Sequence, residues 1–217
     1  YERDHERPPK DEFDLGGLVH TLVLGSHDER IRVIDAWDWR TKAAQEARKA
    51  LRAEGLTPVN RADLLKASRI ARAVRLHPLA GAIFSEGRPE VSMYWPSEVA
   101  LEDGSSHVVM CRGRVDWVRS NAIVDLKTAG RPGGSELDEF GRQAANLNYP
   151  LAAAHYADGW EALTGEALPF LTVTVETEEP HFVTVSQYDP DDLDAGRTRM
   201  EQAKAEFARR TLSGQWE

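Results

Sequence analysis

Two aspartates and a lysine are the residues of this sequence best placed to do chemistry. Asp116 lies in one apolar, strand-like segment, and Asp125 and Lys127 lie in the next one, after a turn dipeptide at 120–121. A turn at this position predicts two antiparallel strands. It places Asp116 opposite Asp125 and Arg114 opposite Lys127. Because side chains alternate along a strand, we expect all four to share one face of the sheet.

Two opposed carboxylates need a reason to be there, since like charges about 5 Å apart destabilise a sheet. A divalent cation supplies one: Mg²⁺ prefers oxygen ligands and commonly uses one or two carboxylates plus water and substrate phosphate. Lys127 would then orient or deprotonate a metal-bound water, or neutralise a phosphoryl-transfer transition state. We therefore expect Mg²⁺, with Mn²⁺ as its substitute. The same residues would also suit an exposed sheet face of mixed charge.

The surrounding pattern predicts the elements that must hold these residues. Apolar residues at helical spacing predict helices, and alternating segments predict strands. We expect helices over 14–24, 41–54, 61–76, 136–162 and 190–211, the fourth of them bent at Pro150. We expect strands over 89–96, 97–101, 108–118, 122–127, 170–176 and 181–188, and a mobile loop at 131–134. Helices on both sides of a strand block predict an α/β fold, a mixed central sheet flanked by helices. No linker divides the chain, so we expect one domain over 1–217.

Composition excludes several classes of protein. No apolar run approaches the roughly 18 residues that a membrane helix needs. The single cysteine, Cys111, excludes a disulfide framework and any four-cysteine zinc or iron–sulfur site within one chain. The net charge of −9 argues against a surface coated in positive charge. Residues 40–75 nevertheless hold ten Lys or Arg against three Asp or Glu. This segment forms either a local positive surface or two solvated helix faces.

The order Asp116, then Asp125-Leu126-Lys127 resembles the PD-(D/E)xK nuclease motif. More narrowly, six blocks in family order resemble the RecE (exonuclease VIII) family of recombination exonucleases. They are residues 15–20, 90–95, 111–116, 124–128, 149–159 and 214–216, and they span almost the whole chain. The resemblance implies a restriction-endonuclease-like core. The family carries a short helical segment ahead of the point where this sequence starts, so we expect a short N-terminal segment to be missing.

The resemblance also implies roles for individual residues. His20 matches the metal-binding histidine of the family. Asp116 and Asp125 match its two metal carboxylates, and the backbone carbonyl of Leu126 is expected to be a further metal ligand. Lys127 matches the catalytic lysine. For His20, the alternative is an ordinary core or boundary histidine on an apolar helix.

Supporting positions follow the family pattern less closely. Tyr156 fits a helical tyrosine of related nucleases, but Ala152 occupies the place of the glutamine expected four residues earlier. We expect Gln143 to substitute for that glutamine. Arg114 is expected to support DNA binding, and Glu90 is a candidate for a further acid near the metal.

By resemblance, the protein is expected to be a Mg²⁺-dependent exodeoxyribonuclease. It would digest linear double-stranded DNA 5′ to 3′, releasing 5′-phosphomononucleotides and leaving 3′ single-stranded tails for recombination by annealing. The resemblance further implies a RecT-like annealing protein as partner and a homo-oligomer, for example a ring-shaped tetramer. It also implies a location in the cytoplasm of a bacterium or of a phage-infected cell. No membrane partner or iron–sulfur cluster is expected. Two alternatives remain: a restriction-like or structure-specific endonuclease on the same scaffold, and a catalytically degenerate DNA-binding recombination module.

Overall fold

The computed structural model describes residues 11–26 and 29–216 and confirms the predicted α/β class. The elements in chain order are α1 (Asp11–Leu24), β1 (Ile31–Val33), α2 (Lys42–Ala53), β2 (Thr57–Val59), α3 (Arg61–Leu76), α4 (Pro78–Ile83), β3 (Arg88–Ala100), β4 (Ser106–Arg119), β5 (Ala122–Ala129), α5 (Leu137–Asn146), α6 (Tyr149–Thr164), β6 (Phe170–Glu176), β7 (Val183–Gln187) and α7 (Pro190–Ser213). Within these described residues, no helix has the length and apolarity needed to cross a membrane.

Local signals set most helix ends where the sequence predicted them. The Asn60 side chain accepts a hydrogen bond from the Asp63 backbone N–H at 2.8 Å, which caps α3. At the start of α7, the Asp189 side chain accepts from the Asp191 backbone N–H in the same way. Gly55, which follows α2, has a φ of 74°, a left-handed conformation that glycine adopts without a Cβ clash. Helix ends therefore depend on contacts within a few residues.

The structure differs from the sequence prediction at four places, one of which is the short helix α4, which was not predicted. The helix predicted over 136–162 is two helices, α5 and α6, because Asn148 between them has a left-handed φ of 55° and Pro150 occupies the first turn of α6. The strands predicted over 89–96 and 97–101 are one continuous strand, β3. Strands β1 and β2, which pair in parallel, were not predicted, because three residues are too few to show a period.

The five longer strands form a mixed sheet in the order β3-β4-β5-β6-β7. Strands β3, β4 and β5 pair antiparallel in sequence order. Strands β5 and β6 run parallel: the Ile123 N–H donates to the Pro169 carbonyl at 3.0 Å, and further along both strands the Thr177 N–H donates to the Ala129 carbonyl at 2.8 Å. The predicted mixed sheet is therefore confirmed.

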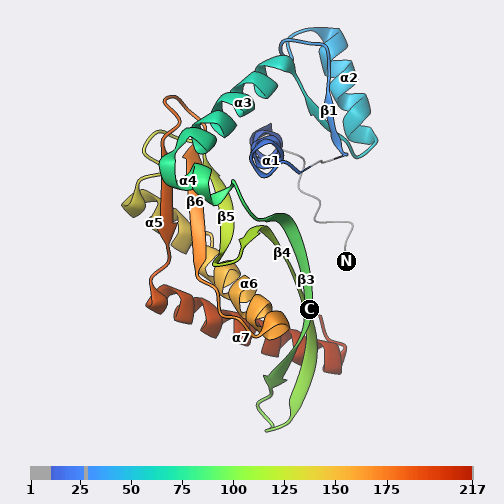
Figure 1. Cartoon of the computed structure of the whole chain (residues 1–217). Helices are drawn as coiled ribbons and strands as arrows, with labels where there is room; N and C mark the ends of the chain where they lie inside the picture. The colour runs from blue at the N-terminus through green and yellow to red at the C-terminus, as the bar shows by residue number, and fades with distance from the viewer. Residues whose placement is uncertain (1–10, 27–28, 217) are drawn as a thin grey trace. The chain divides into compact units, whose positions relative to one another are not determined.

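The chain forms two compact units, and the sheet contributes strand segments to both. One unit comprises the described residues up to 85 together with 126–135 and 174–184, and the other comprises 86–125, 136–173 and the described residues from 185 onward. In the first unit, α1 packs against α3, and β1 and β2 form a separate two-stranded sheet. In the second unit, β3 and β4 form a long curved ribbon with α6 and α7 packed against it (Figure 1).

Close approach of α6 to this ribbon explains two of the glycines. A Cβ at Gly113 in β4 would lie 2.8 Å from the Tyr156 ring, and a Cβ at Gly159 in α6 would lie 2.6 Å from the Trp95 ring. Real Cβ atoms do not make contacts this short. Glycine at both positions therefore lets a helix and a strand pack together around two aromatic rings.

The segment after β5 was predicted to be a mobile loop, and its end is anchored. Residues 131–134 form turns, and Ser135, which follows them, is buried. The Ser135 hydroxyl donates to the Glu176 carboxylate at 2.9 Å, and the Ser135 backbone N–H donates to the same oxygen at 3.3 Å. Glu176 is only 1% exposed. A buried carboxylate at the end of β6 thus fixes the chain directly after this loop.

Candidate active site

The hairpin of β4 and β5 has the predicted turn and the predicted register. Its described pairs run from the turn at 120–121 to Trp117 opposite Val124. The next position in this register holds Asp116 and Asp125, and both residues are half-buried. The two carboxylate residues therefore stand opposite each other on neighbouring strands of one unit.

A third carboxylate residue, Glu90, lies on the other side of Asp116. Strand β3 pairs with β4 before and after Glu90, in a register that puts Glu90 opposite Asp116. Glu90 has a φ of 49°, which is rare for a non-glycine residue and marks local strain in the strand. Its carboxylate lies 3.7 Å from the Arg114 guanidinium. Strained backbone of this kind is frequent near functional sites, so Glu90 remains a candidate for the site.

Burial along β4 does not alternate where the strand passes this point. Trp117 and Val118 are both buried, next to the half-buried Asp116. The pairing with β3 keeps one register on both sides of Asp116, so the strand continues through this position. Both faces of β4 are therefore covered beyond Asp116, and the shared face of the motif residues stays a prediction.

Strand β5 does keep its alternation around the motif. Leu126 is fully buried, at 0% exposed, whereas Asp125 and Lys127 on either side of it are half-buried. The Leu126 side chain thus fixes the strand in the core, and Asp125 and Lys127 point to its other side. The Asp125 carboxylate and the Lys127 ammonium are thus two residues apart on one strand. A cation held in place in this way can stabilise the charge that develops during phosphoryl transfer.

His20 lies on α1 and is half-buried. It follows by one helical turn Gly16, at which a Cβ would lie 3.4 Å from the Thr128 hydroxyl. The middle of α1 is thus packed against the end of β5, within the first unit. In the part of the chain that the structure describes, no three His, Cys, Asp or Glu side chains gather closely enough to hold a metal ion. The ligand set of His20, the two aspartates and the Leu126 carbonyl therefore stays a prediction.

The residues predicted to support DNA binding lie on different elements. The Tyr156 ring covers the Gly113 backbone and stacks on Phe170, with ring centroids 6.4 Å apart. It therefore has a packing role, and its contact with DNA stays a prediction. Gln143 on α5 and Ala152 on α6 are both half-buried. No described contact assigns the missing glutamine's role to Gln143.

One histidine that packs against β4 was not predicted from the sequence. His155 on α6 has Nε2 3.1 Å from the Arg112 carbonyl oxygen, and its ring centroid lies 4.6 Å from that of Trp95. Burial lowers the pKa of His155, and the hydrogen bond to the Arg112 backbone opposes this shift. Its Nδ1 is buried without a hydrogen-bond partner among the described residues. His155 therefore supports the strand in its neutral form.

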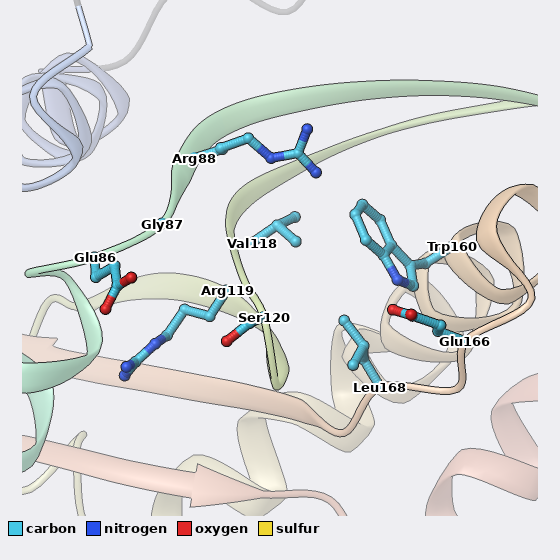
Figure 2. A pocket seen from close by; sticks show the side chains of 9 residues that line it. All are labelled: Glu86, Gly87, Arg88, Val118, Arg119, Ser120, Trp160, Glu166 and Leu168. Atoms are coloured by element: carbon cyan, nitrogen blue, oxygen red, sulfur yellow. The ribbon is translucent and has the colours of Figure 1, made fainter.

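A cavity of about 360 Å³ opens beside the turn between β4 and β5. Figure 2 shows its lining, which is Glu86, Gly87, Arg88, Val118, Arg119, Ser120, Trp160, Glu166 and Leu168. The Arg88 guanidinium lies 5.7 Å from the centroid of the Trp160 ring, a cation–π distance. The cavity contains none of the predicted site residues and equal numbers of acidic and basic side chains. It is therefore distinct from the carboxylate site.

Comparison with known proteins places this geometry in a family. A family model described as "PDDEXK-like domain of unknown function (DUF3799)" matches residues 2–211. The crystal structure of a protein from Eubacterium rectale, described as a candidate exonuclease, superposes with a TM-score of 0.64 at 17% identity, over 98% of this chain and 71% of that chain. A second solved structure, SSO0001, has a TM-score of only 0.35 at 12% identity, over 89% of this chain and 84% of that one, and supports no argument. No curated protein matches the chain. The predicted restriction-endonuclease-like fold is thus confirmed.

Proposed function

Because the chain belongs to the family of PDDEXK-like domains of unknown function (DUF3799), we propose that it is a Mg²⁺-dependent exodeoxyribonuclease. Membership of the PD-(D/E)xK superfamily, predicted from the motif, is confirmed by this match. The narrower assignment to the RecE family is part of the proposal. So are its consequences: 5′ to 3′ digestion of linear double-stranded DNA, 5′-phosphomononucleotides as products, and 3′ tails for annealing.

The facing position of Asp116 and Asp125 in the register of β4 and β5 is the observation that carries the proposal. Neighbouring carboxylates repel each other, so this arrangement costs stability unless a cation neutralises it. Carboxylate oxygens are the donors that Mg²⁺ prefers, and both residues are open enough to take a ligand. The donor set thus fits a divalent ion, with the Leu126 carbonyl and His20 as further proposed ligands.

Each motif residue has a distinct role in this proposal. Asp116 and Asp125 would hold the ion through their carboxylate oxygens. When bound, the ion supplies Lewis-acid activation of the scissile phosphate and of the attacking water. The Lys127 ammonium, two residues after Asp125, neutralises charge that develops on the phosphate oxygens. Arg114, near Glu90, contacts the DNA backbone as a second cation.

Two kinds of support favour an exonuclease over other nucleases. The Eubacterium rectale protein of similar fold is described as a candidate exonuclease. The blocks that resemble RecE run from 15–20 to 214–216 in family order. On the same grounds we propose double-stranded DNA ends as substrate, a RecT-like annealing partner, a homo-oligomer and a cytoplasmic location. The basic segment 40–75 is the proposed positive surface for the DNA.

Digestion of end-labelled linear duplex DNA tests the proposal. The duplex carries different labels at its 5′ and 3′ ends, and reactions contain Mg²⁺, Mn²⁺ or EDTA, beside covalently closed circular DNA. We expect early release of the 5′ label with either metal, no release in EDTA, and intact circles. Cleavage of circles would replace the exonuclease with an endonuclease. Binding of DNA without any cleavage would indicate a catalytically degenerate DNA-binding module. Ala152, at the place where related nucleases have a glutamine, is the reason to consider this alternative.

A further inference from the structure

The β3–β4 ribbon has an open face opposite the one that α6 and α7 cover. Met93, Trp95 and Cys111, whose side chains point toward the helices, are buried. Residues of the opposite parity are exposed, and in the middle of the ribbon they are large and apolar. We call Tyr94, Pro96, Val108 and Met110 the apolar patch; Tyr94 is 66%, Val108 56% and Met110 67% exposed. Neighbouring apolar side chains exposed on two paired strands are typical of an interaction surface.

The two ends of this face carry opposite charges. Toward the carboxylate site lie Arg112 and Arg114, both exposed. No described residue forms an ion pair with the Arg112 guanidinium, and Arg114 is 3.7 Å from Glu90. Toward the tip lie three exposed acids, which form the acidic end of the face: Glu98 in β3, and Glu102 and Asp103 in the tip loop. Hydrogen bonds from Ser105 lower the pKa of Asp103, which keeps that carboxyl ionised.

We propose that this face docks against the same face of a second copy of the chain, with the two ribbons antiparallel about a two-fold axis. Pro96 pairs with Met110, Glu98 pairs with Val108 two residues toward the tip, and Tyr94 pairs with Arg112 two residues toward the site. An axis through Met110 therefore brings Arg112 of each copy to Glu98 of the other. The apolar patches meet at the centre, and the same charge pair forms twice, as an isologous contact requires.

The charge pattern favours a second copy over other partners. A nucleic-acid surface would be positive along its length, because phosphates repel carboxylates, and the acidic end of this face does not suit it. An unrelated protein would have to match an acidic end, an apolar centre and a basic end in that order. A rotated second copy meets this requirement automatically. The face is short, about 27 Å from residue 106 to 114 at roughly 3.4 Å per residue, so we expect a dimer of about micromolar affinity.

Sedimentation velocity over a dilution series tests the central contact. We expect wild-type protein to shift from dimer to monomer on dilution, and Met110→Glu to raise the dissociation constant by at least about tenfold, since it buries an unpaired charge. The matched control is Leu163→Glu, which adds the same charge at an exposed apolar residue of α6. It should dissociate as wild type does. Wild-type protein that stays monomeric at about 100 µM, or equal effects of both variants, would overturn the proposal.

Charge reversal tests the orientation. Arg112→Glu alone and Glu98→Arg alone should each weaken the dimer, because each places like charges together twice. A mixture of these two variants should recover dimers, since every contact in the mixed dimer is again between opposite charges. Failure of the mixture to recover, with the single variants folded by circular dichroism, would exclude the antiparallel arrangement. Unchanged mass combined with weaker DNA binding by Arg112→Glu would make the face a DNA surface and would likewise overturn the proposal.

Discussion

Two sets of carboxylates in this molecule have opposite surroundings. Glu176 at the end of β6 is 1% exposed and accepts two hydrogen bonds from Ser135. Asp116 and Asp125 are half-buried, and the register of β4 and β5 places them opposite each other on neighbouring strands. The first arrangement satisfies a buried charge with nearby donors, which is what stability requires. The second arrangement places like charges together, which stability does not favour.

This difference distinguishes Glu176, which stabilises the fold, from Asp116 and Asp125, which form the candidate active site. Removing Glu176 should leave buried donors unpaired and cost folding free energy. Removing Asp125 should relieve repulsion from Asp116 and remove a proposed metal ligand, so we expect its effect on activity to exceed its effect on folding free energy. Stability and activity should therefore respond in opposite ways at the two places, and measuring both for each variant tests the assignment.

The largest effect is expected for Asp125→Asn, which keeps the shape of the side chain and removes its charge. Nuclease activity should fall on the order of a thousandfold, because the amide is a poor ligand for Mg²⁺. The free energy of unfolding, from urea titration, should change less than it does in Glu176→Ala. Glu161→Gln, at an exposed position on α6, is the matched control and should keep full activity. Activity within tenfold of wild type in Asp125→Asn would remove Asp125 from the site.

Metal binding should distinguish the candidate active site at Asp125 from the buried Glu176 without any assay of activity. Addition of Mg²⁺ at a hundredfold excess over its dissociation constant should stabilise wild-type protein by about 2.7 kcal/mol, because the ion binds only the folded chain. Thermal unfolding measures this shift. The stabilisation should be absent in Asp125→Asn and retained in Glu176→Gln. A shift of equal size in all three proteins would show that the ion binds elsewhere.

Glu176→Ala tests the anchor. It leaves the Ser135 hydroxyl and N–H buried without an acceptor, which should lower the free energy of unfolding by about 1–3 kcal/mol. Glu176→Gln retains an acceptor oxygen and should cost less. Urea titration at pH 7 compares the two. If the alanine variant were as stable as wild type, the Ser135 contact would not hold the loop end.

The smallest effect concerns His155, beneath β4. Burial lowers its pKa in the folded protein relative to the unfolded chain, so the unfolded chain takes up the proton first as the pH falls. Stability from this group is therefore present above a pH of about 6.5 and is lost progressively below it. Melting temperatures at neutral and mildly acidic pH should differ more for wild type than for His155→Gln. An equal pH dependence of the melting temperature in the two proteins would contradict a lowered pKa at His155.

Local parts of the fold were predictable because local interactions decide them. The side-chain cap of Asn60 and the left-handed Gly55 set helix ends from within a few residues. The turn at 120–121 set the register that brings Asp116 and Asp125 together, since a short turn fixes the pairing that follows it. Pro150 indicated a bend in the helix expected over 136–162, but the complete break at Asn148 was not predicted, because the apolar pattern continues through it.

The sequence by itself thus determined the motif, its hairpin and the α/β class, all of which follow from short-range propensity and periodicity. Only the tertiary structure decided which residues face the core and which stay open. It packed Tyr156 on Gly113, joined Ser135 to Glu176 across 41 residues of chain, and left Met110 exposed on the ribbon. These outcomes depend on contacts between elements far apart in sequence, and a one-dimensional pattern does not specify which distant surface covers a given side chain.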